Sequence, residues 1–193
     1  MTDNPLGFAT GNVSYLRVLE DDDYELISNC INDQQFNKFL VQGWKPVTPE
    51  NIQKQFADER NIENAIQFAQ CEKNSDKFVG WCGLYKWDKI SHSQELRSFV
   101  DPTNWGHGFG TEQHAFMLKI GFERYNLNRI HCGTNQNNSG VLRIYEKLDL
   151  VKEGISRQET FRNGKYFDTV RYSILRSEYN SKVKKLVDSV LSM

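Results

Sequence analysis

The residues Trp105-Gly106-His107-Gly108-Phe109-Gly110-Thr111-Glu112 connect an apolar segment typical of a strand to an amphipathic segment typical of a helix. Three glycines at alternating positions let the backbone turn sharply and approach a ligand closely. The first N–H groups of the following helix lack partners within the helix and point to the same place. The stretch therefore predicts a loop that binds phosphate, although ordinary turn glycines between a strand and a helix are an equally simple explanation.

Two common phosphate-binding motifs do not match this loop. A Walker loop ends in Gly-Lys-Ser/Thr, and the dinucleotide fingerprint places its third glycine three residues after the second. Here three glycines alternate and Thr111 and Glu112 follow them. The loop therefore belongs to another class of anion site.

Composition narrows the class of protein. A chain of 193 residues with 38% hydrophobic residues has the size and composition of a single globular domain. It contains no long apolar run and no signal-like segment at 1–14, so we expect a cytoplasmic protein without a membrane span. The 24 basic and 25 acidic residues are scattered, which speaks against nucleic-acid binding. The cysteines at 30, 71, 82 and 132 lack the spacing of metal ligands or disulfides, so we expect no metal.

The periodicity of apolar residues predicts alternating elements. Strands are expected at 15–19, 65–72, 78–87, 94–100, 129–134, 151–157 and 166–175, and helices at 20–32, 49–60, 111–125 and 141–148. In the third helix, Ala115, Leu118, Phe122 and Tyr125 recur on one face, which should pack on the sheet. Asn163-Gly164 is a strong hairpin signal. This order predicts a mixed α/β protein with one central sheet.

The motifs in this order resemble a known family. Val100-Asp101-Pro102, the glycine loop, a helix, a strand, residues 135–138 and Tyr145-Glu146-Lys147 are similar to the GNAT acetyltransferase superfamily, and most to its ribosomal-protein N-terminal acetyltransferases. The resemblance implies a GNAT-like domain at 15–180, with a mostly antiparallel sheet that is splayed at the acetyl-CoA site and flanked by helices. Residues 1–14 would then be an N-terminal extension and 181–193 a polar C-terminal helix or tail.

The resemblance also implies a cofactor site. Acetyl-CoA would be the acyl-donor cosubstrate, with its pantetheine arm facing backbone groups of Phe99 and Val100. Its pyrophosphate would be held by the backbone amides of the loop, namely those of Gly106, His107, Gly108, Phe109, Gly110 and Thr111. Asn138 would form a hydrogen bond with the cofactor. From the residues alone, Asn138 is equally well explained as a helix cap, and His107 as a solvent-facing loop residue.

The proposed chemistry needs an acid and a base. By resemblance, Tyr145 would protonate the departing thiolate of CoA, and Glu95 would act as a general base through water. Each has a simpler explanation, because Tyr145 lies beside the inward-facing Val141, Ile144 and Leu148, and Glu95 lies on a half-exposed strand. Glu112 is expected to interact with the helix N-terminus.

The sequence departs from the family pattern after the helix that carries Tyr145. The pattern has Gly-Phe at this place, whereas this chain has Asp149-Leu150. Aspartate tolerates the left-handed conformation that ends a helix, and leucine keeps the apolar contact, so we expect the fold to be retained. Val141 also replaces a common serine or alanine.

These features predict direct acetyl transfer from acetyl-CoA to a primary amine. By resemblance to the ribosomal-protein subgroup alone, the favoured acceptor is a protein N-terminal amine, and the alternative is a small amine such as a polyamine, amino sugar or aminoglycoside. The acceptor site is expected near residues 36–44 and 161–167, although Phe36, Phe39 and Trp44 are explained equally by packing on the sheet. A non-catalytic acyl-CoA-binding or regulatory module is a third option, and a homodimer is one option for assembly.

Overall fold

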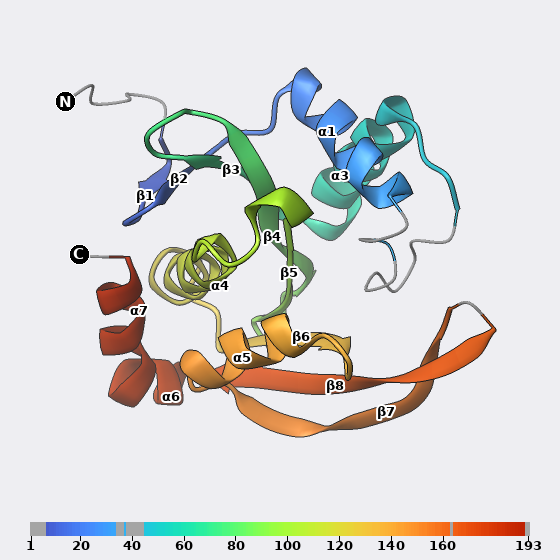
Figure 1. The fold of residues 1–193 in the computed structure, drawn as a ribbon. Coiled ribbons are helices and arrows are strands. Elements are labelled where there is room, and N and C mark those ends of the chain that lie inside the picture. Colours follow the sequence, from blue (N-terminus) through green and yellow to red (C-terminus); the bar gives the residue numbers. More distant parts are fainter. Residues whose placement is uncertain (1–6, 34–36, 38–44, 163, 192–193) are drawn as a thin grey trace.

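The computed structural model describes residues 7–33, 37, 45–162 and 164–191, and these form one eight-stranded sheet flanked by helices (Figure 1). The strand order is β1-β2-β3-β4-β5-β6-β8-β7. The strands are β1 (Ala9–Thr10), β2 (Ser14–Arg17), β3 (Ile66–Glu72), β4 (Phe78–Asp88), β5 (Ser93–Val100), β6 (Arg129–Asn135), β7 (Val151–Arg162) and β8 (Lys165–Leu175). Within the described chain, β5 and β6 are the one parallel pair. The predicted mixed α/β fold with a mostly antiparallel sheet is confirmed.

The helices cover both faces of the sheet (Figure 1). On one face lie α1 (Asp21–Asn32) and α3 (Pro49–Glu63), and on the other lie α4 (Phe109–Lys119), α5 (Ser139–Lys147) and α7 (Lys184–Val190). Short helical turns occur at Pro102–Asn104, Ile120–Arg124, Arg176–Glu178 and Tyr179–Val183. Successive side chains of a strand point to opposite faces of the sheet, so neighbouring residues pack against different helix layers. Trp81 of β4 packs edge-on against Phe56 of α3 at 5.2 Å between ring centroids, whereas the next residue, Cys82, lies in the core beneath α4.

Local signals in the sequence explain where the first helices begin. Thr48 caps α3, since its Oγ1 accepts a hydrogen bond from the Asn51 amide at 3.3 Å, and Pro49 occupies the first turn. At the start of α1 the Asp23 carboxylate accepts the Glu20 amide at 2.8 Å and pairs with Arg17 at 2.7 Å. These contacts fix α1 to the end of β2.

Tyr125 departs from the predicted helix face. Ala115, Leu118 and Phe122 are buried as expected, but Tyr125 is 37% exposed. The regular part of α4 ends at Lys119 and a π-helical turn follows at Ile120–Arg124. Because this turn is wider than an α-helical one, it shifts the phase of the residues beyond it and turns Tyr125 outward.

Asp149 behaves as predicted after α5. It adopts the left-handed conformation with φ of 58°, its carboxylate pairs with Lys182 at 2.7 Å, and Leu150 is buried. Gly164, in the predicted hairpin turn, also has a positive φ, of 75°, between the paired residues Arg162 and Lys165. The other turn residue, Asn163, lies outside the described residues.

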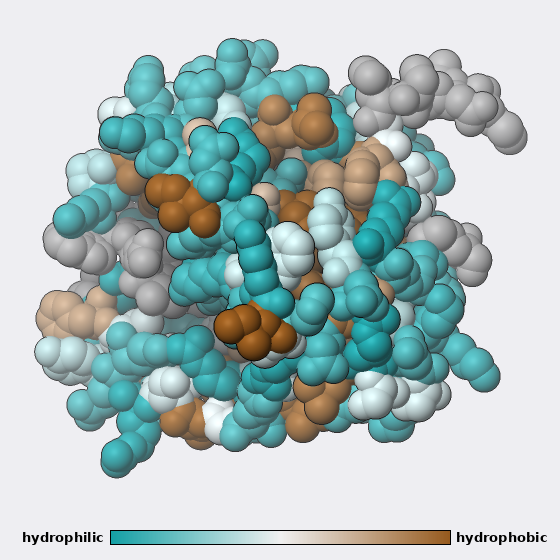
Figure 2. Space-filling view, turned by 180° about the vertical axis from the view of Figure 1, so that it is seen from behind, coloured by the Kyte–Doolittle hydropathy of each residue, from teal (hydrophilic) through white to brown (hydrophobic). Residues whose placement is uncertain are grey.

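Both ends of the described chain contribute to the packed structure. Strand β1 and Ser14 belong to the sheet, although they lie in the stretch predicted to be an extension. Val187 and Leu191 are buried in the core next to α4. On the face drawn in Figure 2, hydrophobic side chains form separate small areas among hydrophilic ones. None of the described helices combines the length and apolar character needed to cross a membrane.

Candidate active site

Strands β5 and β6 pair over a short distance and then diverge. Their register is Ser93 with Arg129, Gln94 with Ile130 and Glu95 with His131. Beyond Glu95, β5 continues along β4 as far as Val100, and β6 continues along β8 as far as Asn135. The second half of β5 therefore presents a backbone edge to a gap in the sheet, as the resemblance predicts.

The register of β5 against β4 decides which backbone groups face this gap. The Asp101 amide donates to the Val79 carbonyl of β4 at 2.9 Å, and residues in a strand alternate in direction. Phe99 therefore directs its backbone groups to β4, and its carbonyl also accepts a hydrogen bond from Gln113 Nε2 at 2.7 Å. Val100 and Ser98 face the gap instead. Of the two residues predicted to contact pantetheine, Val100 has this orientation, and its carbonyl accepts Trp105 Nε1 at 2.8 Å; Ser98 is the second residue so oriented, and contact with pantetheine stays a prediction.

The glycine loop has the geometry that its sequence suggests. Gly106 and Gly108 have φ of 87° and 90°, a conformation that favours glycine, and Gly108 directly precedes α4. His107 is exposed, whereas the Phe109 ring is buried, so Phe109 offers its amide alone to a ligand. A Cβ on Gly110 would lie 3.0 Å from Ile144 Cδ1, which shows how closely α4 and α5 approach behind the loop. The amides from 108 to 111 form the open N-terminus of an eleven-residue helix.

Asn138 caps α5, as the simpler explanation predicts. Its Oδ1 accepts the Val141 amide at 3.4 Å, and its Nδ2 donates to Thr134 Oγ1 at 3.2 Å. Both ends of the side-chain amide thus have partners within the chain. A hydrogen bond to a cofactor remains a prediction for this residue.

Tyr145 lies in the core at the point where the gap begins. Its side chain is 3% exposed, and its ring contacts Tyr172 and His114 at 4.9 and 5.5 Å between centroids. The thiol of Cys132, the residue that follows the last β6 partner of β5, lies beside the Tyr145 hydroxyl. Burial raises the pKa of Tyr145 well above its ordinary value, and Cys132 adds to that effect. The residue is thus a core tyrosine at the vertex of the gap, where β5 and β6 separate, and its role as the acid stays a prediction.

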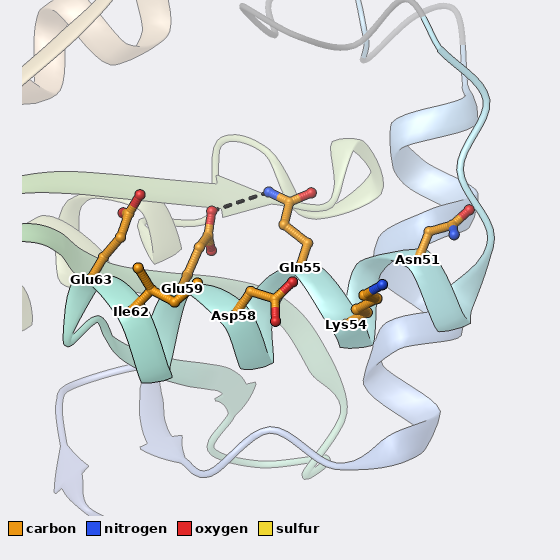
Figure 3. Close-up of a pocket in the computed structure, with 7 residues that line it drawn as sticks. All are labelled: Asn51, Lys54, Gln55, Asp58, Glu59, Ile62 and Glu63. Carbon is orange, nitrogen blue, oxygen red and sulfur yellow. Dashed lines mark hydrogen bonds between the residues drawn. The ribbon is translucent and has the colours of Figure 1, made fainter.

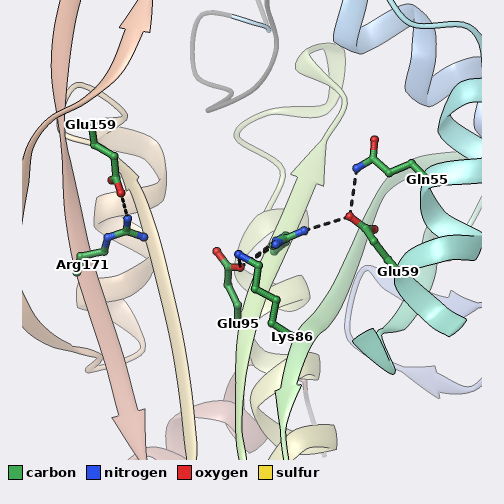
Figure 4. Close-up of polar contacts among 7 residues, drawn as sticks. Gln55, Glu59, Lys86, Glu95, Glu159 and Arg171 are labelled. Carbon is green, nitrogen blue, oxygen red and sulfur yellow. Dashed lines mark hydrogen bonds and ion pairs between the residues drawn. The ribbon is translucent and has the colours of Figure 1, made fainter. Parts of the chain in front are cut away.

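Glu95 lies at the same vertex within a group of ion pairs. Its carboxylate is 2.8 Å from Arg97 and 3.1 Å from Lys86, and Arg97 also reaches Glu59 of α3 at 3.2 Å (Figure 4). Burial alone would raise the pKa of Glu95, but the two cations outweigh it, so the pKa is lowered. Glu95 is therefore an ionised carboxylate rather than a base poised near neutrality.

Three consecutive polar residues of α4 are buried, and the sequence interpretation missed two of them. Glu112, Gln113 and His114 are 3%, 0% and 2% exposed. His114 contacts Gly110 O through Nδ1 at 2.8 Å, and burial lowers its pKa to about 4, so it is neutral. The polar run Thr111-Glu112-Gln113-His114, followed by the apolar residues 115–118, was the signal in the sequence.

The prediction for Glu112 is wrong. Its carboxylate is directed away from the N-terminal amides of its own helix. It accepts the amides of Asn12, Val13 and Ser14 at 2.6, 2.8 and 3.0 Å, in the turn between β1 and β2. These partners lie about one hundred positions earlier in the sequence, so no local pattern could indicate them.

A hollow of about 310 Å³ runs along α3, beside the ion pairs of Glu95 (Figure 3). Its lining residues are Asn51, Lys54, Gln55, Asp58, Glu59, Ile62 and Glu63. Glu59 and Glu63 project from the same side of the helix, one turn apart. Burial raises the pKa of Glu59, and the charge of Glu63 adds to this. Among the described residues, Glu63 Oε2 is buried without a hydrogen-bond partner.

The predicted acceptor segments are covered only in part. Residues 36 and 38–44, with Phe36, Phe39 and Trp44, lie outside the described residues. In the β7–β8 hairpin, Phe161 and Tyr166 are exposed and their rings lie 4.9 Å apart. Further along the hairpin Glu159 pairs with Arg171, on the other side of β6 from Glu95 (Figure 4). No cluster of three metal-ligating side chains occurs in the part of the chain that the structure describes.

A splayed sheet, a glycine loop at a helix N-terminus and a tyrosine at the vertex define an acyltransferase of the GNAT type. Residues 15–151 match the model of the acetyltransferase (GNAT) domain, and the chain belongs to this family. It is an N-acetyltransferase that uses acetyl-CoA as its acyl donor.

Several known proteins are similar over nearly the whole chain. A spermidine N(1)-acetyltransferase of Vibrio cholerae is 26% identical over 85% of this chain and 94% of that protein. An uncharacterised N-acetyltransferase of Bacillus licheniformis is 25% identical over 85% and 93%. The crystal structure of a spermidine N-acetyltransferase from Vibrio cholerae with CoA and spermine superposes with a TM-score of 0.78, at 24% identity over 87% of this chain and 98% of that one. The fold is thus shared, and membership of the ribosomal-protein subgroup stays a prediction.

Proposed function

We propose that this protein acetylates a primary amine of a small polyamine, using acetyl-CoA. The acceptor ammonium first releases one proton to water, the neutral amine nitrogen then attacks the thioester carbonyl carbon, the carbon–sulfur bond breaks, and the CoA sulfur gains a proton as the nitrogen loses its second one. Tyr145 is the proposed proton donor to sulfur, because its hydroxyl lies at the vertex of the gap and carries its proton at neutral pH. No covalent enzyme intermediate is needed.

The observation that carries the choice of acceptor is the row of carboxylates leading away from this vertex. Glu95 lies at the vertex, Arg97 links it to Glu59, and Glu63 follows one turn further along α3. The unpartnered Glu63 oxygen offers an ammonium group a charge-assisted hydrogen bond. A polyamine has several ammonium groups along one flexible chain, so it can reach separated carboxylates at once.

The relatives support the same choice. The protein from Vibrio cholerae that matches most of this chain is named for spermidine. We therefore prefer the small-amine alternative to a protein N-terminal amine. Glu95 is proposed to attract and orient the acceptor ammonium, because a carboxylate with a lowered pKa is a weak base.

The test is thiol release from acetyl-CoA with a panel of amines. The panel consists of spermidine, putrescine, glucosamine and a peptide whose N-terminal amine is its sole free amine. Spermidine is expected to have the highest kcat/KM. A preference for the peptide would restore the protein N-terminal interpretation, and CoA binding without turnover of any amine would favour a non-catalytic module.

A substitution at Glu63 tests more directly whether the row of carboxylates Glu95, Glu59 and Glu63 binds the acceptor. Glu63→Gln should lower kcat/KM for spermidine by roughly tenfold, the loss expected for one charge-assisted hydrogen bond, and should leave glucosamine turnover nearly unchanged. Glu50→Gln is the matched control, because Glu50 lies on the exposed first turn of the same helix. An equal effect of Glu63→Gln on both amines would contradict the proposed binding of the polyamine along this row of carboxylates.

A further inference from the structure

Glu112 is a buried carboxylate that the proposed chemistry does not use. It lies in the first turn of α4, directly after the glycine loop, and is 3% exposed. Besides the amides of Asn12, Val13 and Ser14, it accepts the hydroxyl of Ser14. Removing an ionised carboxylate from water is costly unless several donors compensate it. Three backbone amides and a hydroxyl supply that compensation here.

The turn between β1 and β2 is shaped around this carboxylate. A Cβ on Gly11 would lie 2.8 Å from Glu112 Oε2, so a side chain at position 11 would displace the carboxylate or the turn. The backbone of the turn thus lies as close to the Glu112 carboxylate as it would lie to a bound anion. The chain uses its own side chain to fill an anion site in its N-terminal hairpin.

A second connection joins the same hairpin to the same helix turn. Gln70 of β3 donates through Nε2 to Ser14 Oγ at 2.6 Å and to the carbonyl of Phe109 at 3.1 Å. Phe109 is the first residue of α4. The first turn of α4 is therefore held at two points, through the Glu112 side chain and through the Phe109 carbonyl.

The position of this turn matters because its amides are the proposed donors to the diphosphate. A free carboxylate beside them would repel a multiply charged ligand. Because the Glu112 carboxylate is directed into the β1–β2 turn and compensated there, the loop side of the helix end stays favourable for an anion. Gly106 and Gly108 fix the turn of the loop but make no contact through a side chain, so the orientation of the amides depends on what holds the helix behind them.

We propose that Glu112 is a positioning residue for cofactor binding, which couples the N-terminal hairpin to the diphosphate-binding turn of α4. Residues 11–14 of the hairpin then contribute to the free energy of cofactor binding through their contacts with Glu112. This inference rests on the proposed placement of the CoA diphosphate at the glycine loop. It predicts that Glu112 affects the binding of CoA and not the chemical step.

The first experiment compares Glu112→Gln with Glu123→Gln. Both changes replace a glutamate by its amide. Glu123 lies in the π-helical turn that follows α4, where it pairs with Lys184. We expect Glu112→Gln to raise the Kd for free CoA and the KM for acetyl-CoA roughly tenfold, with kcat at saturating acetyl-CoA within twofold of the wild type. The control variant should leave all three values unchanged. Unchanged CoA affinity in a folded Glu112→Gln protein would overturn the inference.

Hydrogen exchange of the wild-type protein tests the coupling without any substitution. Coupling between two sites is reciprocal, so saturating free CoA should slow exchange of the amides at 12, 13 and 14 several-fold. Ser14→Ala removes the hydroxyl that contacts both Glu112 and Gln70, and should weaken this protection. If CoA binds and exchange at these amides does not change, Glu112 holds the hairpin and nothing more. If the wild type does not bind CoA at all, the placement of the cofactor fails instead.

Discussion

The backbone conformation at Gly108 gives a prediction whose size follows from the structure. Gly108 has φ of 90°, and a Cβ added to it would meet no atom within 4 Å. Gly108→Ala therefore creates no clash, and its cost is that of holding an L-residue in the left-handed region, about 1–2 kcal/mol. The loop is exposed, so the free protein can escape this strain by moving the loop.

Binding of CoA must then restore the left-handed conformation. Since 1.4 kcal/mol corresponds to a factor of ten, the Kd for free CoA should rise roughly 5- to 30-fold, as measured by isothermal titration. Gly154→Ala is the control, because Gly154 also has open space around a new Cβ and lies in β7, away from the loop. A Kd for Gly108→Ala within twofold of the wild type would refute the reasoning, since the loop conformation would then contribute nothing to binding.

Three further changes separate the proposed roles of the buried residues. Tyr145→Phe keeps the packed ring and should lower kcat roughly 100-fold, while the free energy of unfolding changes by less than about 1.5 kcal/mol; a kcat within threefold of the wild type would exclude Tyr145 as the acid. Glu95→Gln should lower kcat/KM for the amine without moving the acid limb of the pH profile, because the lowered pKa keeps Glu95 ionised throughout the assay range; a displaced limb would identify Glu95 as the titrating base. His114 has its pKa lowered to about 4 from 6.5, so its contribution is present above pH 6.5 and is lost as the pH falls toward 4. Urea unfolding at pH 7 and pH 5 should differ by about 2 kcal/mol more for the wild type than for His114→Phe, and equal differences would contradict the buried neutral state.

Local physical chemistry accounts for the parts of the fold that the sequence predicts well. The starts of α1 and α3 could be predicted because Asp23 and Thr48 each accept a backbone amide three positions away in the sequence. The left-handed Asp149 was predictable because many helices end with a residue in that conformation, which aspartate tolerates. The gap in the sheet came from resemblance, and its position was confirmed by the short β5–β6 register.

The remaining features depend on contacts that are distant in sequence. The choice between Phe99 and Val100 is set by the register of β5 against β4, which a strand pattern does not contain. The role of Glu112 depends on a turn at 12–14, and the exposure of Tyr125 depends on one π-helical turn. For Val100 and Glu112 the local pattern placed the residue on the expected element and the tertiary partner decided the orientation, whereas Tyr125 lies beyond the end of the predicted helix.

Cys132 indicates how the surroundings at the vertex of the gap affect the pKa of a thiol. Burial raises the pKa of this thiol to about 12, and the neighbouring Tyr145 partly offsets that rise. A CoA thiolate leaving at the same place would likewise be disfavoured as an anion, so sulfur should gain its proton as the carbon–sulfur bond breaks. The pKa of Tyr145 is raised as well, so the tyrosine does not release its proton in advance. The proton that the amine loses must then return to Tyr145, which makes this residue a relay between nitrogen and sulfur in the proposed reaction.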